Sequence, residues 1–158
     1  MKKAIGLLVL LFLIGCTGKA EETYTIDDAK KDGHVIVEHK TTTFDQIRQG
    51  ALEVENIDQL VEFLVAAENK EEASATVSIF DPDGSHYENK FESDGKSIRF
   101  HNSYAGYKGA PKGNFTCEYI QRRGPIVYVE SCDSEKGENV STMIAFVGKD
   151  EAFREAEK

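Results

Sequence analysis

The stretch FTCEYIQRRGPIVYVESC, residues 115–132, predicts a β hairpin that turns at Gly124-Pro125. A turn centred there pairs residues whose numbers sum to 249, so Cys117 lies opposite Cys132. Opposed residues of antiparallel strands have Cα separations that suit a disulfide. We therefore expect a Cys117–Cys132 disulfide, which would stabilise the fold by about 3 kcal/mol; two free thiols are the alternative.

Residues outside this hairpin predict further strands. Four more segments have strand composition, namely 34–39, 75–80, 87–92 and 140–147. Turn sequences stand at Asp81–Gly84 and at Asp94-Gly95. A two-residue turn at Asp94-Gly95 would pair Phe91 with Ile98, with apolar side chains on one face and charged ones on the other. We therefore expect only one face of the sheet to be covered.

One segment has the pattern of an amphipathic helix. Apolar residues recur at i, i+3, i+4 and i+7, in the order Ile57, Leu60, Val61, Leu64 and Ala67. Asn56 is the expected N-cap, and the helix should end near Lys70. The predicted fold class is therefore α+β: residues 32–148 form one main helix packed on an antiparallel β meander of about five or six strands, stapled by the disulfide. Residues 149–158 are expected to form a charged tail or a short helix.

The N-terminal residues indicate export. Two lysines precede the apolar run Ala4–Ile14, which is too short to span ~30 Å of hydrocarbon as a helix, so residues 1–15 are typical of a signal peptide. Leu13-Ile14-Gly15-Cys16 resembles the lipobox of bacterial lipoproteins, in which the cysteine is lipidated and becomes the first residue. We therefore expect Cys16 to carry the acyl chains that anchor the chain to the extracytoplasmic face of the cell membrane, or to an outer membrane if the host is Gram-negative. An ordinary secretory signal with an incidental cysteine is the alternative.

The mature chain would be acidic. Without the first fifteen residues, 17 basic residues remain against 28 acidic ones, a formal charge of −11. This excess argues against nucleic acid and against an anionic membrane surface as partners, because both attract basic patches. After the lipidated cysteine, residues 16–31 are polar and lack a sustained period, so we expect a flexible tether with a root-mean-square span of about 20 Å.

No motif in the expected domain predicts a catalytic residue, a metal ligand or a cofactor. The four histidines are scattered and lack zinc-site spacing: His34, His39, His86 and His101. Asp81–Glu92 has some features of a calcium loop, but His86 stands where that loop requires glycine. The chain contains no G-x-S-x-G motif and no phosphate-binding glycine loop. We therefore expect a protein that is not an enzyme.

The connection 103–113 is the candidate binding segment. It carries Tyr104, Tyr107, Lys108 and Lys112 in an otherwise acidic protein. Long loops with exposed aromatic residues often form recognition surfaces. The alternative is a plain connection whose tyrosines cover the edge of the sheet.

The order of these elements resembles an uncharacterised lipoprotein family of Gram-positive bacteria, known by a domain of unknown function. The resemblance rests on Gly33–Ile36, on Asn56–Leu60 and on the paired cysteines, and it covers residues 32–133. The chain departs from the family pattern at residues 80–84 and 101–104. The resemblance implies a cell-surface location and a shared disulfide, and it implies no activity.

These observations lead to one expected function and two alternatives. We expect a membrane-anchored binding or interaction module of the cell envelope, with an envelope protein or a wall polymer as partner. The first alternative is a small-ligand-binding lipoprotein, which a concave pocket on the uncovered sheet face would indicate. The second is a hydrolytic envelope enzyme.

Overall fold

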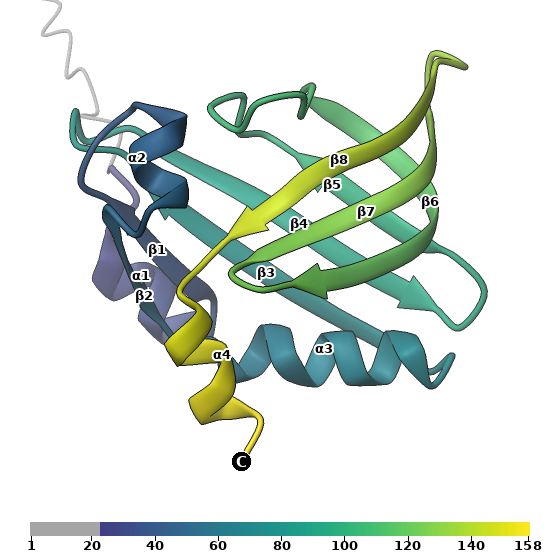
Figure 1. The fold of residues 1–158 in the computed structure, drawn as a ribbon, viewed down its shortest axis with the longest axis horizontal. Coiled ribbons are helices and arrows are strands. Elements are labelled where there is room, and N and C mark those ends of the chain that lie inside the picture. Colours follow the sequence, from purple (N-terminus) through teal and green to yellow (C-terminus); the bar gives the residue numbers. More distant parts are fainter. Residues whose placement is uncertain (1–22) are drawn as a thin grey trace, which may run out of the picture.

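The computed structural model describes residues 23–158, which form one sheet and four helices (Figure 1). The strands are β1 Val35–His39, β2 Leu52–Glu55, β3 Glu72–Phe80, β4 His86–Asp94, β5 Ile98–Asn102, β6 Gly113–Arg123, β7 Ile126–Ser134 and β8 Asn139–Val147. The helices are α1 Ile26–Lys31, α2 Phe44–Arg48, α3 Asp58–Glu68 and α4 Asp150–Ala156. The strand order is β2-β1-β3-β4-β5-β6-β7-β8, and the sheet curls into a half-barrel.

The predicted fold class is wrong in the number of strands and in the weight that it gave to one helix. A curled sheet of eight strands dominates, rather than five or six strands beneath one main helix, and the described helices are all short. The sheet is also mixed, because β1 pairs with β3 in parallel. Strand β2 was not predicted, because it has four residues, of which only Leu52 is buried. An apolar pattern that short does not identify a strand.

Helix α3 explains the parallel pair. The chain leaves β2, which is antiparallel to β1, crosses as α3, and enters β3 on the other side of β1. In Figure 1, α3 lies across one open end of the half-barrel, where it contacts β3 and β6. Phe63 of α3 is buried, and its ring centroid is 5.8 Å from that of Phe91. Phe91 begins a row of stacked rings that continues through Phe100 to Phe115, so the core fills the inside of the curl.

Contacts between distant strands hold the curl closed. Asn89 of β4 donates a buried 3.1 Å hydrogen bond from Nδ2 to the carbonyl of Ala145 in β8. Lys149, two residues after β8, places its Nζ 2.7 Å from Oε2 of Glu53 in β2. These two contacts join elements that are far apart in the strand order, so the last strand is fixed over the middle of the sheet.

The β6–β7 hairpin confirms the predicted register. Arg123 pairs with Ile126 around the two-residue turn, and Cys117 pairs with Cys132. The predicted disulfide between these cysteines is present, with a Cα–Cα distance of 3.9 Å. The turn sequence and the cysteine positions therefore specified this hairpin from local information.

The β4–β5 hairpin differs from its prediction by two residues. Phe91 pairs with Phe100 rather than with Ile98, because the loop spans four residues instead of two. Oδ1 of Asp94 accepts hydrogen bonds from the backbone N–H groups of Lys96 (2.9 Å) and Ser97 (2.8 Å), and this turn replaces the expected tight one. A shift of two residues keeps every side chain on its face, so the predicted apolar and charged faces are retained.

The start of α3 also differs from the prediction. Asn56 does not cap the helix with its side chain; its φ is 57°, and Nδ2 donates a 3.1 Å hydrogen bond to the carbonyl of His34. Asparagine tolerates this left-handed conformation better than most residues. The residue therefore turns the chain from β2 into α3 and ties the turn to β1.

The expected tether is partly folded. Residues 26–31 form α1, which is capped by Thr25 in a capping box with Asp28 and which buries Ala29. The folded domain therefore begins before residue 32, and the prediction of a flexible tether through residue 31 is wrong for this segment. The expected signal peptide and the lipidation site Cys16 lie outside the described residues. Within residues 23–158, no helix is long and apolar enough to cross a membrane.

Candidate functional site

An open groove of about 1100 Å³ lies between α3 and strands β5 and β6. Its apolar lining comes from both walls, with Val61, Leu64, Val65 and Ala67 on the helix and Ile98, Tyr119 and Ile120 on the strands. The β4–β5 turn closes one end, where a Cβ on Gly95 would lie 2.5 Å from the carbonyl oxygen of Lys70. Because glycine alone allows this approach, the turn packs tightly against the end of the helix and the wall is well defined.

The groove holds the exposed apolar side chains of the domain. Among the described residues, Val65 (52% exposed) and Tyr119 (60% exposed) are the two exposed large hydrophobic residues, and both line the groove. Tyr119 lies two residues after the buried Cys117 on β6 and lines the strand side of the groove. Val65 extends the apolar stripe of α3 past the buried core. Two elements therefore leave apolar surface facing the same space.

The rim of the groove carries charges of both signs. Three acidic and three basic residues line it: Glu68, Glu118, Glu157, Lys70, Lys96 and Arg122. Arg122 is held by hydrogen bonds to the carbonyl of Gly124 (2.9 Å) and to Asp150 (3.4 Å), and its guanidinium lies 4.7 Å from the ring centroid of Phe153. The rim is therefore formally neutral in a chain that is strongly acidic overall.

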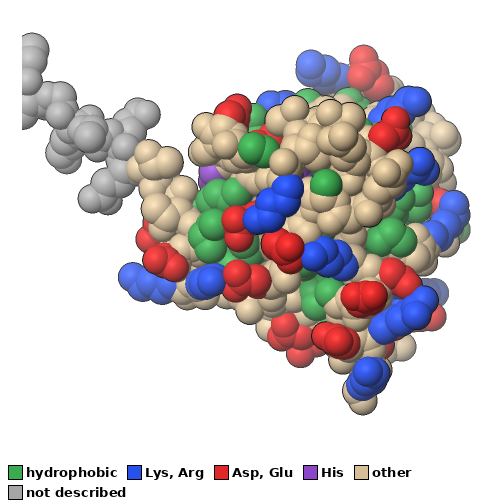
Figure 2. Space-filling model, turned by 60° about the vertical axis from the view of Figure 1, so that its left-hand side comes forward, with side chains coloured by type: hydrophobic (Ala, Val, Ile, Leu, Met, Phe, Trp, Pro, Cys, Tyr) green, Lys and Arg blue, Asp and Glu red, His purple; other side chains and the backbone are tan. Residues whose placement is uncertain are grey.

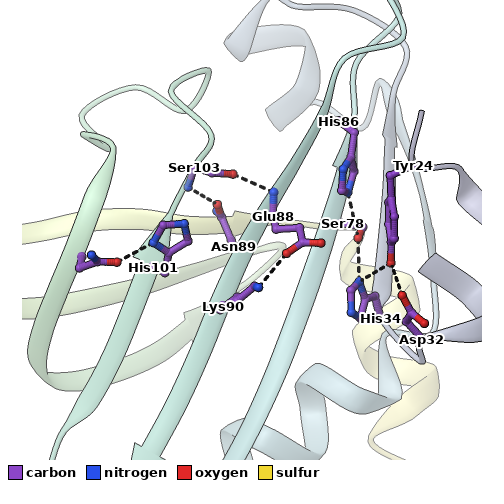
Figure 3. Close-up of polar contacts among 11 residues, drawn as sticks. Tyr24, Asp32, His34, Ser78, His86, Glu88, Asn89, Lys90, His101 and Ser103 are labelled. Carbon is purple, nitrogen blue, oxygen red and sulfur yellow. Dashed lines mark hydrogen bonds and ion pairs between the residues drawn. The ribbon is translucent and has the colours of Figure 1, made fainter. Parts of the chain in front are cut away.

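A second candidate, the outer histidine cluster, consists of Tyr24, Asp32, His34, Ser78 and His86 (Figure 3). Nδ1 of His34 lies 2.9 Å from Oγ of Ser78, and Nε2 of His86 lies 3.2 Å from the same oxygen. The ring of Tyr24 stacks on His86 at 4.5 Å, and its hydroxyl donates to Asp32 at 2.8 Å. Ser78 alternates with core residues of β3, so the cluster lies on the outer face of the sheet.

The chemistry of the outer cluster is limited by burial. Ser78 has no exposed surface, so it does not present a nucleophile to solvent. Burial, and the nearby His34, lower the pKa of His86, although Glu88 acts in the opposite direction. Burial and the Asp32 carboxylate raise the pKa of Tyr24 to about 12. The cluster therefore joins the N-terminal segment to the sheet through a network of side-chain hydrogen bonds.

A third group, the inner histidine cluster, consists of His39, Asp81, Tyr104 and Tyr107 at the end of β1 and β3. These strands are parallel, so their C-terminal ends meet and bring His39 beside Asp81, with Nδ1 2.8 Å from Oδ1. The hydroxyl of Tyr104 donates to Asp81 (3.2 Å), and that of Tyr107 lies 3.4 Å from Nε2 of His39. Burial lowers the pKa of His39 despite Asp81, so the imidazole is neutral at pH 7.

The predicted binding loop has a different character from the one expected. Tyr104 and Tyr107 are 2% and 1% exposed, because their hydroxyls are bound in the inner cluster; the expectation of exposed aromatic residues is wrong. Lys108 and Lys112 are exposed, and Nζ of Lys112 lies 5.2 Å from the ring centroid of Tyr87. The loop therefore offers its lysines to solvent, while its tyrosines fix it to the sheet.

The groove, which the sequence analysis missed, left a weak signal in the sequence. Leu64 and Ala67, at the end of the apolar stripe Ile57 to Ala67, are only partly buried, so this part of the stripe is left for the groove. His39 and Asp81 were missed because their proximity depends on parallel pairing. In residues 23–158, no group of three or more His, Cys, Asp or Glu residues has the geometry of a metal site.

No protein-family model, curated protein or solved structure matches this chain. The resemblance to the Gram-positive lipoprotein family therefore stays a prediction. The face shown in Figure 2 does not indicate a partner of one charge, since acidic and basic side chains are interspersed on it. The choice of function accordingly depends on the geometry of the groove and of the two histidine clusters.

Proposed function

We propose that this chain is a non-enzymatic binding module of the cell envelope, anchored through a lipid on Cys16, which holds a segment of a partner protein in the groove between α3 and β6. The observation that carries the proposal is the convergence of Val65 and Tyr119, the two exposed large hydrophobic side chains of the described domain, on one groove. Exposed apolar surface that is gathered in one place and rimmed by polar residues is typical of interaction sites.

The composition of the groove favours a protein partner. An apolar centre that includes a tyrosine, surrounded by charged residues, matches the anatomy of protein interfaces. The mixed signs of the rim favour a partner segment with complementary charges next to its apolar side chains.

The expected lipidation of Cys16 supports the proposed location. A basic start, a short apolar run and a lipobox-like Leu13–Cys16 predict export followed by anchoring, and the disulfide suits an oxidising compartment. The groove lies between α3 and β6, whereas residue 24 is attached to the outer face of β3 and β4, so the groove stays open when the chain is tethered.

Small-ligand binding is the second candidate function, and a specific observation favours it. A hollow of about 480 Å³ lies over β4, β5 and β6 on the uncovered sheet face. Lys90, Arg99, His101 and Asn114 line it, together with acidic residues. A thermal-shift screen with small polar ligands tests this candidate, and an Arg99→Ala variant should lose any stabilisation found.

Photo-crosslinking on intact host cells tests the leading proposal. A photo-reactive residue in place of Tyr119 should give a discrete adduct with one protein, whereas the same residue in place of Lys136, in the distant β7–β8 turn, should give none. Val65→Asp should abolish the adduct without unfolding the domain, because Val65 is 52% exposed. An adduct that persists in the Val65→Asp chain, or no adduct at all, would rule out the groove as the partner site.

A further inference from the structure

The segment that leads from the N-terminus to β1 is attached to the sheet chiefly through Tyr24. Its ring stacks on His86 of β4, and its hydroxyl lies 3.3 Å from Nδ1 of His34. The remainder of the segment adds one fully buried side chain, Ala29 of the six-residue helix α1, and an exposed ion pair in which Nζ of Lys30 lies 2.9 Å from Oε2 of Glu55 in β2. A helix this short is not stable alone, so the segment stays in place only while its side-chain contacts hold.

The hydrogen bonds of the outer histidine cluster require one particular protonation state. The hydroxyl of Tyr24 donates to Asp32, so its oxygen can only accept. For the contact with Tyr24 to be a hydrogen bond, Nδ1 of His34 must carry a proton, which it also directs toward Oγ of Ser78. The Ser78 hydroxyl then donates its single proton to Nε2 of His86. Nε2 of His86 must therefore be unprotonated for every bond to be made.

We propose that Tyr24 and the pair His34–His86 form an acid-released latch, which sets how far the folded sheet can stand from the lipidated Cys16. When His86 takes up a proton at Nε2, it becomes a second donor toward Ser78, and the buried Ser78 hydroxyl loses its only acceptor. The new charge also faces His34 across that hydroxyl. Loss of the Ser78 bond frees the His86 ring on which Tyr24 stacks, so the attachment of the segment to the sheet is weakened.

The charges around the latch determine the direction of the pH effect. Asp32 and Asp28 lie on the Tyr24 side, and Glu88, which is paired with Lys90, lies next to His86 on β4. Glu88 favours the charged imidazole, but burial and His34 outweigh it, so the pKa of docked His86 lies below the ordinary histidine value. The Tyr24 ring that stacks on His86 adds to this burial, so release exposes the imidazole. A histidine whose pKa is lowered in the docked state binds its proton preferentially in the released state. Docking is therefore stable above about pH 6.5 and weakens as the pH falls.

Release changes the length of chain between the anchor and the sheet. Seven residues, 17–23, separate Cys16 from Tyr24 when the latch is closed, and eighteen residues, 17–34, separate Cys16 from β1 when it is open. The maximum reach rises from about 25 Å to about 60 Å, at ~3.5 Å per residue. This consequence rests on the lipid anchor of the proposed function, whereas the latch itself does not.

Hydrogen exchange tests the latch on the full-length chain in detergent micelles at pH 7.5 and pH 5.0, after correction for intrinsic rates. The amides of Ala29, Asp32 and His34 bond to carbonyls within the segment. Their protection should fall by up to about tenfold for each pH unit below 6.5, and β7 reports the separate loss of global stability that protonation of His39 causes. His86→Gln keeps an acceptor for Ser78 but lacks both the titrating group and the ring on which Tyr24 stacks, so protection should be lower at pH 7.5 and should fall little further at pH 5.0. Equal protection at the two pH values, or an unaltered fall in His86→Gln, would overturn the latch.

Matched controls separate the latch from its membrane consequence. His101→Gln removes an exposed histidine of the same sheet face, which bonds to Asn114 and not to Tyr24, so the fall should persist. Energy transfer from a dye at Lys136→Cys to labelled phosphatidylcholine vesicles should decrease at pH 5.0 in the wild-type chain and not in His86→Gln. Release without this decrease would refute the change of reach but keep the latch, and failure of the chain to bind vesicles would refute the lipid anchor.

Discussion

The inner and outer histidine clusters use the same side chains with different results. Each joins a histidine at one end of β1 to a tyrosine, which comes from the preceding segment in the outer cluster and from the distant loop 103–113 in the inner one. The inner tyrosines are almost completely buried, and among the described residues no buried polar side-chain atom lacks a partner. Tyr24 is only half-buried and belongs to a segment with little other support. Because it is buried, the inner cluster holds residues 103–113 on the sheet as long as the domain is folded. The outer cluster can release the N-terminal segment while the rest of the domain stays folded.

Removing the centre of the inner cluster should produce the largest loss. His39→Ala takes the bonding partner from Asp81 and Tyr107 inside the fold, and we expect the free energy of unfolding to fall by about 3 kcal/mol. Urea unfolding followed by circular dichroism measures the change. His101→Ala, at an exposed histidine, should cost less than about 0.5 kcal/mol. Similar losses for the two variants would contradict the structural role of the inner cluster.

The pH dependence of stability should come mainly from the inner cluster. Burial lowers the pKa of both His39 and His86, so the unfolded chain binds these protons first and stability is lost as the pH falls below about 6.5. Each group contributes a slope of at most about 1.4 kcal/mol per pH unit. Urea midpoints between pH 7.5 and pH 5.5 should show a smaller slope in His39→Gln than in wild type. An unchanged slope would mean that His39 is not buried as a neutral group.

Removing the outer tyrosine should have a local effect. Tyr24→Ala should free residues 24–33 at every pH and reduce the global free energy of unfolding by no more than about 1 kcal/mol, because Tyr24 lies outside the core. Hydrogen exchange should show loss of protection in α1 and none in β7. Loss of protection throughout the sheet would show that the N-terminal segment is an integral part of the fold.

The smallest effect concerns the carboxylate beside the latch. Glu88→Gln removes the charge that favours protonated His86, so the pH of release should fall by about 0.3 unit, which corresponds to about 0.4 kcal/mol. Glu92→Gln, on the same strand and paired with Arg99, is the matched control and should leave the midpoint unchanged. A rise in the midpoint after Glu88→Gln would reverse the assigned direction of this charge.

The two hairpins show how far the sequence determines this fold. In β6–β7, a two-residue turn and a cysteine pair agree on one register, so local information was sufficient. In β4–β5, Asp-Gly suggested the same kind of turn, but the Asp94 carboxylate closed a longer one. The apolar alternation was unaffected, so the faces were predicted correctly although the pairing was not.

The candidate sites depend on pairings that periodicity does not reveal. His39 meets Asp81, and His34 meets Ser78, only because β1 and β3 are parallel neighbours. Parallel pairing requires the α3 crossover, and nothing local to either strand indicates it. Tyr104 and Tyr107 were wrongly predicted to be exposed for the same reason, because their hydroxyls bond to Asp81 and His39 at the paired ends of β3 and β1. To predict the groove, the position of α3 relative to β6 would have to be known, and this position depends on the curl of the whole sheet.

The hydrogen bond from Asn89 to Ala145 has a consequence for the order of events in biosynthesis. The donor is made 56 residues before its acceptor, and until β8 arrives Nδ2 of Asn89 lacks the acceptor that it has in the folded domain, although Oδ1 already accepts from Ser103. A chain that stops short of β8 therefore remains incompletely folded, however well its hairpins form, and contacts this distant in sequence slow folding. The domain can therefore complete its folding only after β8 has been made available to pair with the rest of the sheet.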